Sequence, residues 1–460
     1  MGNLKYSKQN GARSESMGRD SIWRLLFRFS GPAIISMTVA STYNMVDYIF
    51  VGRLGEDAQA AMTVTFPLMM SFIALAGGTG LGATSLISRS LGEGNKRNAD
   101  KAACVAITLC IILSMLIALL CLPNIKPILR MLGASGSVLA LAENYASVLI
   151  KCIIFSCLSM ILGNIIRAEG NPVFSSSVMI FSSIINIIID PLLIFGLGPF
   201  PVMGIKGAAV ATVIAQALSS SIYLGYLMSS KAGYKFYPVY FLPSPRVVLE
   251  IYRVGMASIV RSGVQFVVMG VVNRTAASHG VITLALVGGL IRVSRFVQMP
   301  AIGVGQGLLP LVGYNFGANK MKRVTELVLK AALSGVIWSG TCWMIIMLFP
   351  EFVLTMFDFD PVFFKEGIHA VHLYFICIFI LGIQMIPGFF FQGIGKGFPA
   401  IILSGARHIL FLFPMIMILS PVFGVNGLWI SFPIADVMTF LVGLVWIGLE
   451  FRKCGISFHQ

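Results

Sequence analysis

The sequence predicts an all-α integral membrane protein in which twelve transmembrane helices form two six-helix bundles related by an internal parallel repeat. Three observations predict this fold. Hydrophobic residues make up 57% of the chain and charged residues only 11%, with a mean hydropathy of +0.89, which lies outside the range of ordinary globular domains. Long apolar runs follow one another along the chain, and a set of glycine motifs recurs in its second half.

The apolar runs are long enough to cross a bilayer as helices, which takes ~20 mostly apolar residues. They lack the alternation of polar and apolar residues that the strands of a membrane barrel show. Glycine, proline and clusters of charge mark the ends of each run. The twelve predicted helices are 29–51, 58–87, 102–122, 139–163, 173–196, 207–228, 251–272, 281–310, 327–349, 369–391, 400–420 and 427–450.

The basic residues predict how these helices are oriented, because Lys and Arg are retained on the cytoplasmic side of a membrane. With the N-terminus inside, the cytoplasmic segments hold most of the 33 Lys and Arg residues, Arg407 among them, and the outer segments hold few. Both termini are therefore predicted to be cytoplasmic, in the cell (inner) membrane. The polar start lacks the features of a cleaved signal peptide, so we expect the first helix to be an uncleaved anchor.

An internal repeat relates the two halves of the chain. The stretch "GLGATSLISRSLGEGNKRNA" (80–99) resembles "GQGLLPLVGYNFGANKMKRV" (305–324), with glycines in register. Six helices in each half give both repeats the same orientation, a parallel repeat of the kind that transporters use. We expect an N-terminal bundle (1–230), a cytoplasmic linker (231–250) and a C-terminal bundle (251–460).

Two aspartates stand inside predicted helices, each flanked by apolar residues. Asp47 lies in the first helix, and Asp190 lies in "NIIIDPLLIFG" (186–196) of the fifth. Both helices run outward, and at 1.5 Å per residue each aspartate lies roughly 26 Å from the cytoplasmic start of its helix. An ionised Asp that faces lipid costs at least ~2.5 kcal/mol, so we expect both to point into the N-terminal bundle.

Polar neighbours at helical spacing extend each aspartate into a stripe. Pro191 also lacks an N–H, so it leaves the carbonyl of Ile187 free and is expected to kink the fifth helix beside Asp190. The predicted stripe and cavity lining comprise Tyr43 and Asn44 on the first helix, Ser183 and Asn186 on the fifth, and Thr212 and Gln216 on the sixth.

Few basic side chains are available to neutralise the two aspartates, because no Lys or Arg lies within the predicted first, second, fifth or sixth helix. A mobile cation is the alternative. Burial disfavours a charged carboxylate, which predicts that Asp47 and Asp190 bind H⁺, and Na⁺ is the competing ion because carboxylate, amide and carbonyl oxygens can coordinate it. A purely structural role, with hydroxyl and amide donors satisfying the carboxylates, stays open at this stage.

Other chemistries find no support in the sequence. The eight cysteines are scattered through apolar runs, which is typical of packing residues. The histidines show no metal-ligand spacing, and no metal site or cofactor is expected. Glycine-rich turns lack the lysine of a phosphate-binding loop. The net charge of +15 is spread over short loops, which favours membrane lipid over nucleic acid as its partner. We expect a monomer and no enzymatic activity.

Five motifs follow one another along the chain in a fixed order: "NMVDYIFVGRLG" (44–55), "RAEGNP" (167–172), "NIIIDPLLIFG" (186–196), "GIKGAAVATVIAQ" (204–216) and "GLLPLVGYNFGA" (307–318). These residues resemble those of the multidrug and toxic compound extrusion (MATE) transporters, especially the bacterial members. The resemblance covers nearly the whole chain. It implies a V-shaped pair of bundles that exports amphipathic organic cations and drugs in exchange for H⁺ or Na⁺, with Asp47 and Asp190 at the family's ion-coupling positions and Tyr43, Asn186 and Thr212 lining the cavity.

The second half departs from one branch of that family, whose members carry carboxylates on helices seven and ten. Here Gln265 stands near the acid's place on helix seven, and helix ten has no acid. Ion coupling is therefore expected in the N-terminal bundle. The C-terminal bundle is instead basic, with Arg261, Arg292 and Arg295 inside helices, and Asp436 on the twelfth helix is the expected partner of a buried arginine. We expect a C-terminal polar network with a structural role or one in gating or anion contact.

The sequence leaves two candidate functions open. The first is secondary active export of drugs, driven by an ion gradient. The second is a flippase for a lipid-linked precursor, which related two-bundle families perform and which the three arginines favour. An intramembrane enzyme would need a nucleophile or a metal cluster, and the sequence offers neither.

Overall fold

The computed structural model describes residues 14–355 and 364–453. These residues are helical with short connections, and none of them forms a β-strand. Contacts divide the chain into two compact units, of which unit 1 comprises Met1–Arg19 and Ile35–Gly255 and unit 2 comprises Asp20–Ile34 and Met256–Gln460, in each case as far as the residues are described. Each unit is built around its own hydrophobic core.

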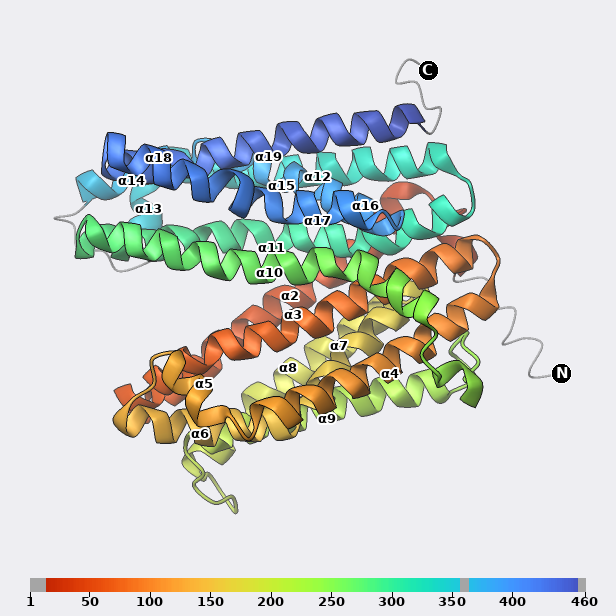
Figure 1. Cartoon of the computed structure of the whole chain (residues 1–460), viewed down its shortest axis with the longest axis horizontal. Helices are drawn as coiled ribbons and strands as arrows, with labels where there is room; N and C mark the ends of the chain where they lie inside the picture. The colour runs from red at the N-terminus through yellow and green to blue at the C-terminus, as the bar shows by residue number, and fades with distance from the viewer. Residues whose placement is uncertain (1–13, 356–363, 454–460) are drawn as a thin grey trace. The chain divides into compact units, whose positions relative to one another are not determined.

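The helices of the first half are α2 (Ile22–Gly52), α3 (Glu56–Gly92), α4 (Lys96–Cys121), α5 (Ile125–Met131), α6 (Gly136–Lys151), α7 (Ile153–Ala168), α8 (Pro172–Phe195), α9 (Ile205–Met228) and η1 (Pro238–Phe241). Within unit 1, α8 packs against α9, and α7 packs against α3, α4 and α9 (Figure 1). Helix α8 is continuous through Pro191 as far as Phe195.

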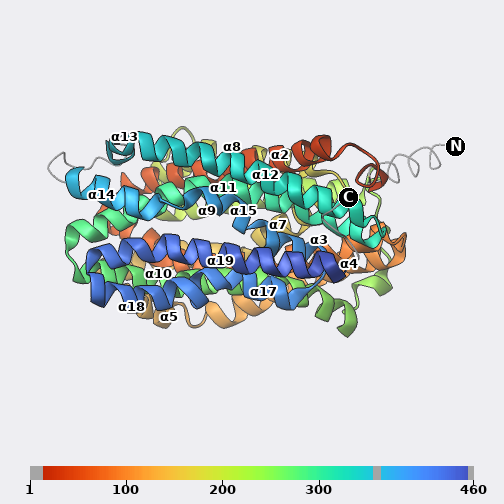
Figure 2. The ribbon, with the colours of Figure 1, turned by 90° about the horizontal axis from the view of Figure 1, so that it is seen from above.

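The helices of the second half are α10 (Pro245–Ser278), α11 (Val281–Gly317), α12 (Met321–Leu348), α13 (Pro350–Thr355), α14 (Phe364–Phe375), η3 (Ile378–Ile380), α15 (Leu381–Gln384), α16 (Ile386–Gly393), α17 (Gly397–Ala406), η4 (Arg407–Leu412), α18 (Phe413–Phe423) and α19 (Val425–Lys453). The segment η4 is a turn of π-helix between α17 and α18. Within unit 2, α11 lies beside α12 and α18 beside α19 (Figures 1 and 2).

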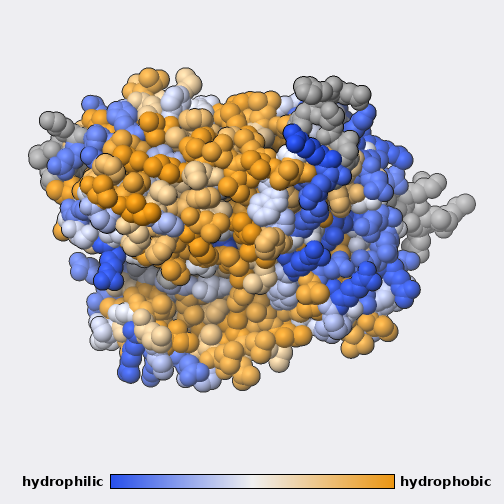
Figure 3. Space-filling view, turned by 45° about the horizontal axis from the view of Figure 1, so that its top comes forward, coloured by the Kyte–Doolittle hydropathy of each residue, from blue (hydrophilic) through white to orange (hydrophobic). Residues whose placement is uncertain are grey.

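The helices have the length and composition of membrane spans. Among the described residues, eleven helical stretches are long and apolar enough to cross a bilayer, and the pair α6 and α7, which bends by 51°, makes a twelfth when it is counted as one span. This confirms the predicted fold class. Hydrophobic side chains cover much of the visible face of the molecule, and hydrophilic ones gather toward the ends of the helices (Figure 3).

The repeat is visible in the way glycines pack. A Cβ atom on Gly80 would collide with Asn164, and one on Gly305 would collide with Phe389. Each member of the second pair lies 225 residues after its counterpart in the first. The glycines therefore allow the same close contact in both units, between α3 and α7 in one and between α11 and α16 in the other.

The first long helix of each half belongs to both units. The start of α2 packs in unit 2, where a Cβ on Gly307 would meet Ser30, and the start of α10 packs in unit 1, where a Cβ on Gly82 would meet the carbonyl of Ile251. Each of these helices then continues into its own unit. Helices α2 and α10 thus contribute residues to both units.

The linker predicted at residues 231–250 packs entirely with unit 1. The Tyr234 hydroxyl donates to the carbonyl oxygen of Ile165 at 2.9 Å, and the Thr108 hydroxyl donates to the carbonyl oxygen of Phe241 at 2.8 Å. These bonds join the connecting segment to α7 and α4.

Candidate functional site

The two aspartates predicted from the sequence both lie in the interior of unit 1. Asp47 on α2 is 4% exposed and Asp190 on α8 is fully buried. They lie near enough to interact electrostatically with each other and with the hydroxyl groups of Tyr43 and Tyr145. Asn186, one turn before Asp190, donates its side-chain amide to Asp190 Oδ1 at 3.3 Å.

The carboxylates in this cluster are short of hydrogen-bond donors. Asp47 Oδ1, Asp190 Oδ2 and Asn186 Oδ1 are buried and have no hydrogen-bond partner among the described residues. In the described part of the chain, no Lys or Arg forms an ion pair with either aspartate. An ionised carboxylate buried without a positive partner costs several kcal/mol. The cluster thus offers three buried oxygens to a proton or another small cation.

The other predicted lining residues differ in their surroundings. Tyr43 is half-buried beside the aspartates, whereas Asn44 is exposed and donates its amide to the carbonyl oxygen of Ala40 at 2.7 Å. Ser183 is buried, but its hydroxyl donates to the carbonyl oxygen of Met179 in its own helix at 3.0 Å. The neighbouring residue, Ser182, is the one that bridges to α9, with a 2.8 Å bond to the carbonyl oxygen of Ala215.

Thr212 and Gln216 are half-buried on α9. Among the described residues, no hydrogen bond joins either of them to the aspartates.

Tyr145 on α6 is the member of the cluster that sequence reasoning missed. Its signal was a hydroxyl-bearing residue inside the apolar run 139–163, but a single tyrosine in such a run does not reveal which interior it faces.

The polar network of unit 2 is centred on Asp436 of α19. Arg407 donates its Nε to Asp436 Oδ1 at 2.5 Å and its Nη2 to Asp436 Oδ2 at 3.3 Å, and Gln384 donates to Oδ1 at 3.1 Å. Such a two-point contact between a guanidinium and a carboxylate is the strongest form of this ion pair. Both side chains are largely buried, at 13% and 5% exposure.

The expectation that Asp436 neutralises Arg261, Arg292 or Arg295 is therefore wrong. Its partner is Arg407, which the charge count placed in a cytoplasmic segment but which lies inside the apolar helical stretch Gly397–Phe423. Arg261 instead lies over the ring of Phe389, 5.6 Å from its centroid. Among the described residues, no acidic group lies within ion-pair distance of Arg261, Arg292 or Arg295.

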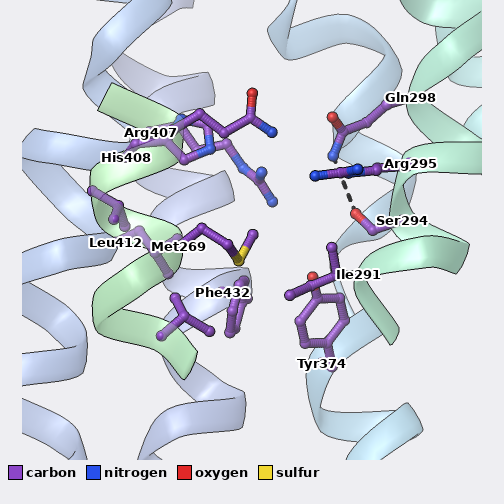
Figure 4. Close-up of a pocket in the computed structure, with 13 residues that line it drawn as sticks. Met269, Ile291, Ser294, Arg295, Gln298, Tyr374, Arg407, His408, Leu412 and Phe432 are labelled. Carbon is purple, nitrogen blue, oxygen red and sulfur yellow. Dashed lines mark hydrogen bonds between the residues drawn. The ribbon is translucent and has the colours of Figure 1, made fainter. Parts of the chain in front are cut away.

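Unit 2 also contains a small cavity beside this network (Figure 4). The predicted residues Gln265 and Arg295 line it, whereas Arg261 and Arg292 do not. Arg407 and His408, the first residues of the π-helical η4, line it as well, and sequence reasoning did not single out either as a site residue. The lining consists of Gln265, Val268, Met269, Val272, Ile291, Ser294, Arg295, Gln298, Tyr374, Arg407, His408, Leu412 and Phe432.

In the described part of the chain, no group of three or more His, Cys, Asp or Glu residues is placed to hold a metal ion.

Comparison with known proteins gives consistent matches over most of the chain. A family model described as MatE matches residues 32–192 and 254–418. The multidrug export protein MepA of Staphylococcus haemolyticus is 26% identical over 434 residues, which cover 94% of this chain and 95% of that protein. MepA of Staphylococcus aureus strain MRSA252 is 27% identical over 439 residues, 94% of each chain.

Solved structures match the fold closely. The crystal structure of a MATE protein in complex with MaL6 has a TM-score of 0.90 and 27% sequence identity, and the match covers 96% of this chain and 99% of that one. A transporter of the MOP superfamily from Pyrococcus furiosus, described as having a binding pocket of reverse polarity, has a TM-score of 0.89 and 27% identity over 96% of this chain and 98% of that one.

Proposed function

The chain belongs to the MatE family of multidrug and toxic compound extrusion transporters, and from this premise we propose that it exports amphipathic organic cations and drugs in antiport with H⁺, with Na⁺ as the competing coupling ion. As a member of this family it is a membrane transporter and not an enzyme. The relatives named as multidrug export proteins support export as the activity.

The observation that carries the proposal is the pair of buried aspartates. Asp47 and Asp190 bring oxygens without donors into the interior of unit 1, and no basic side chain among the described residues pairs with them. A proton bound there removes the cost of a buried negative charge. A positively charged drug competes with the proton for these carboxylates, because both are attracted by their negative charge.

Antiport requires that proton and drug favour different conformations of the protein, since a ligand shifts an equilibrium only by its differential affinity for the two states. Helix α2 offers the mechanical link. Asp47 lies in its later part, in unit 1, while residues 22–34 of the same helix belong to unit 2. A change of charge at Asp47 therefore acts on a helix that is shared between the units. Proton uptake from outside favours drug release, and the return step delivers the proton to the cytoplasm.

The orientation that this mechanism needs is the one predicted from charge, with both termini cytoplasmic in the cell membrane. The basic residues of the connecting segments support it. The small-molecule substrate binds from the cytoplasm or from the inner leaflet. The protein acts as a monomer.

The test is transport by the protein reconstituted in liposomes with an imposed pH gradient or Na⁺ gradient, with fluorescent ethidium as the substrate. The native protein is expected to move ethidium against its gradient, and Asp47→Asn and Asp190→Asn are expected to abolish the dependence on the ion gradient. Asp57→Asn, at an exposed aspartate at the start of α3, is the matched control and should transport normally. Normal coupling in both interior variants would refute the assigned roles.

A flippase for a lipid-linked precursor is the second candidate, and the basic cavity of unit 2 is the observation that favours it. It is distinguished in the same liposomes by the movement of a fluorescent lipid phosphate between leaflets. If the protein is a flippase, it moves that lipid between leaflets whether or not it transports ethidium. If it is a drug exporter, the lipid stays in its leaflet.

A further inference from the structure

The cavity of unit 2 carries an excess of positive charge. Arg295 and Arg407 approach it from opposite sides, Arg295 from α11 and Arg407 from η4 (Figure 4). Asp436 neutralises Arg407, but in the described part of the chain no acidic group pairs with Arg295. No acidic residue is found among the described residues that line the cavity. Arg295 is exposed, and a guanidinium without a counterion at the wall of a cavity attracts an anion because it offers several N–H donors and a permanent positive charge.

Hydrogen-bond donors surround this charge. The side chains of Gln265, Gln298, Tyr374 and His408 all line the cavity. Gln298 uses one N–H to bond Ser294 Oγ at 3.1 Å. The Nδ1 atom of His408 is buried and has no hydrogen-bond partner among the described residues. A guanidinium together with amide and hydroxyl donors is the donor set that binds carboxylate and phosphate oxygens.

The local backbone sets this part of unit 2 apart from unit 1. Carbonyl oxygens of Leu193 and Leu419 are each approached closely by a glycine of the following helix, so the two leucines occupy matching places in the repeat. Gly170 and Gly395 match in the same way, each with a positive φ after its helix. Leu193 follows Gly170 by 23 residues, whereas Leu419 follows Gly395 by 24.

The second repeat thus has one additional residue in this interval, and the π-helical η4 accommodates it. Single-residue insertions of this kind occur frequently at functional sites. Here the π-helical turn is the segment that supplies Arg407 and His408 to the cavity. The additional residue that distinguishes the second repeat is therefore accommodated in the same turn that supplies Arg407 and His408 to the cavity.

The size and the walls of the cavity limit what it can bind. Its volume is about 20 Å³, somewhat more than the roughly 10–15 Å³ that holds one water molecule, and the cavity is partly open to its surroundings. Apolar side chains, among them Met269, Ile291 and Phe432, form the rest of the lining. The cavity therefore suits the charged end of an amphipathic molecule and excludes an entire drug.

We propose that this cavity is an anion site in which Arg295, assisted by Arg407 and His408, binds the phosphate or carboxylate group of an amphipathic molecule. Its polarity is opposite to that of the aspartate cluster, and the site goes beyond the export of cations proposed above. The anionic group can belong to a soluble organic anion or to a lipid headgroup. The site is tested by a binding measurement that needs no ion gradient. If no anion binds, the anion site is refuted but the export proposal is not.

The experiment uses the full chain in nanodiscs of neutral phosphatidylcholine. Calorimetric titration with phenyl phosphate probes a soluble anion, and titration with benzyl alcohol is the neutral control. In a second arm, nanodiscs that contain phosphatidylglycerol probe a headgroup, and native mass spectrometry counts the retained lipid. Thermal melting of each variant establishes that it is folded.

We expect the native protein to bind phenyl phosphate or to retain phosphatidylglycerol in preference to phosphatidylcholine, and not to bind benzyl alcohol. Arg295→Gln should weaken this binding at least tenfold, and Arg295→Lys should weaken it less because the charge remains. Arg292→Gln is the matched control, because Arg292 lies one turn away on α11 outside the lining. Binding of phenyl phosphate alone identifies a soluble ligand, and retention of phosphatidylglycerol alone identifies a lipid.

Three results would overturn the site. The first is native affinity in Arg295→Gln, the second is an equal loss in Arg292→Gln, and the third is the absence of binding in both arms. If Arg295→Gln does not fold, Arg295→Lys decides, since equal affinity for phenyl phosphate in that variant and in native protein would argue against a fitted guanidinium contact.

Discussion

The candidate sites of the two units have opposite charge, although the backbone of one repeats that of the other. Among the described residues, Asp47 and Asp190 of unit 1 have no basic partner, whereas in unit 2 Asp436 pairs with Arg407 and Arg295 lines the cavity beside that pair. Counting from the matched contacts at Ser30 and Ile251, the position of Asp47 corresponds to Val268. Glycine contacts that set helix spacing are retained in both repeats, whereas the charged side chains that they position have diverged. The difference indicates that the repeat preserves packing and leaves the polar chemistry free to specialise.

The same counting places an apolar residue opposite the second aspartate. Asp190 precedes Leu193 by three residues, and Ile416 precedes Leu419 by three. Ile416 is fully buried in unit 2. Neither acid of unit 1 therefore has an acidic counterpart in unit 2, which agrees with a single site of ion coupling.

The largest expected effect comes from the double variant Asp47→Asn with Asp190→Asn. Asparagine keeps the shape of the side chain but cannot take up and release a proton, so gradient-driven export should fall by at least about tenfold, equivalent to ~1.4 kcal/mol. Ethidium accumulation in everted vesicles measures it. The comparison between units fails if the double variant exports at the native rate.

Removing one partner of the buried ion pair in unit 2 should give the next largest effect. Arg407→Met leaves Asp436 without a positive partner, which typically costs about 3–5 kcal/mol of stability. The double variant Arg407→Met with Asp436→Leu removes both charges and should recover most of that loss. Thermal unfolding in detergent compares the three proteins, and an equal loss in the double variant would speak against an electrostatic cause.

The glycine contacts test whether the two repeats pack alike. Gly80→Ala and Gly305→Ala should each destabilise the protein by about 1–3 kcal/mol, because a methyl group is forced into a closely packed contact. Gly225→Ala on α9 is the control, since a Cβ there meets no atom within 4 Å and alanine favours a helix. A loss in only one repeat would show that the contacts are not equivalent.

The smallest effect is expected at Arg292, which is exposed on α11 and does not line the cavity. Arg292→Gln should change stability by no more than about 0.5 kcal/mol and leave ethidium export unchanged. Thermal unfolding and vesicle transport measure the two quantities. A large change would mean that the charge of unit 2 acts as a whole and not through the cavity.

Much of the fold could be predicted from the sequence, because the length and polarity of each run are local properties. The helices, the repeat and the interior position of Asp47 and Asp190 all follow from apolar periodicity and from the cost of charge in lipid. The two glycine motifs also identify the repeat, since close helix contacts require glycine at fixed positions.

The partners of the charged residues could not be predicted in the same way. Tyr145 joins the aspartate cluster from a helix nearly 100 residues after Asp47, so only tertiary packing reveals it. Arg407 lies near the start of its span, so the distribution of charge predicts a cytoplasmic position for it and leaves only Arg261, Arg292 and Arg295 as expected partners of Asp436. The π-helical turn that positions Arg407 depends on one inserted residue, which has no signature in a single apolar run.

The most direct measurement of the central claim is proton release on drug binding. Ethidium is added to the purified protein in weakly buffered solution, and a pH-sensitive dye records the protons released per drug bound. We expect the native protein to release protons and the double variant Asp47→Asn with Asp190→Asn to release none. The same release from both proteins would contradict the claim that these two aspartates couple ion and drug.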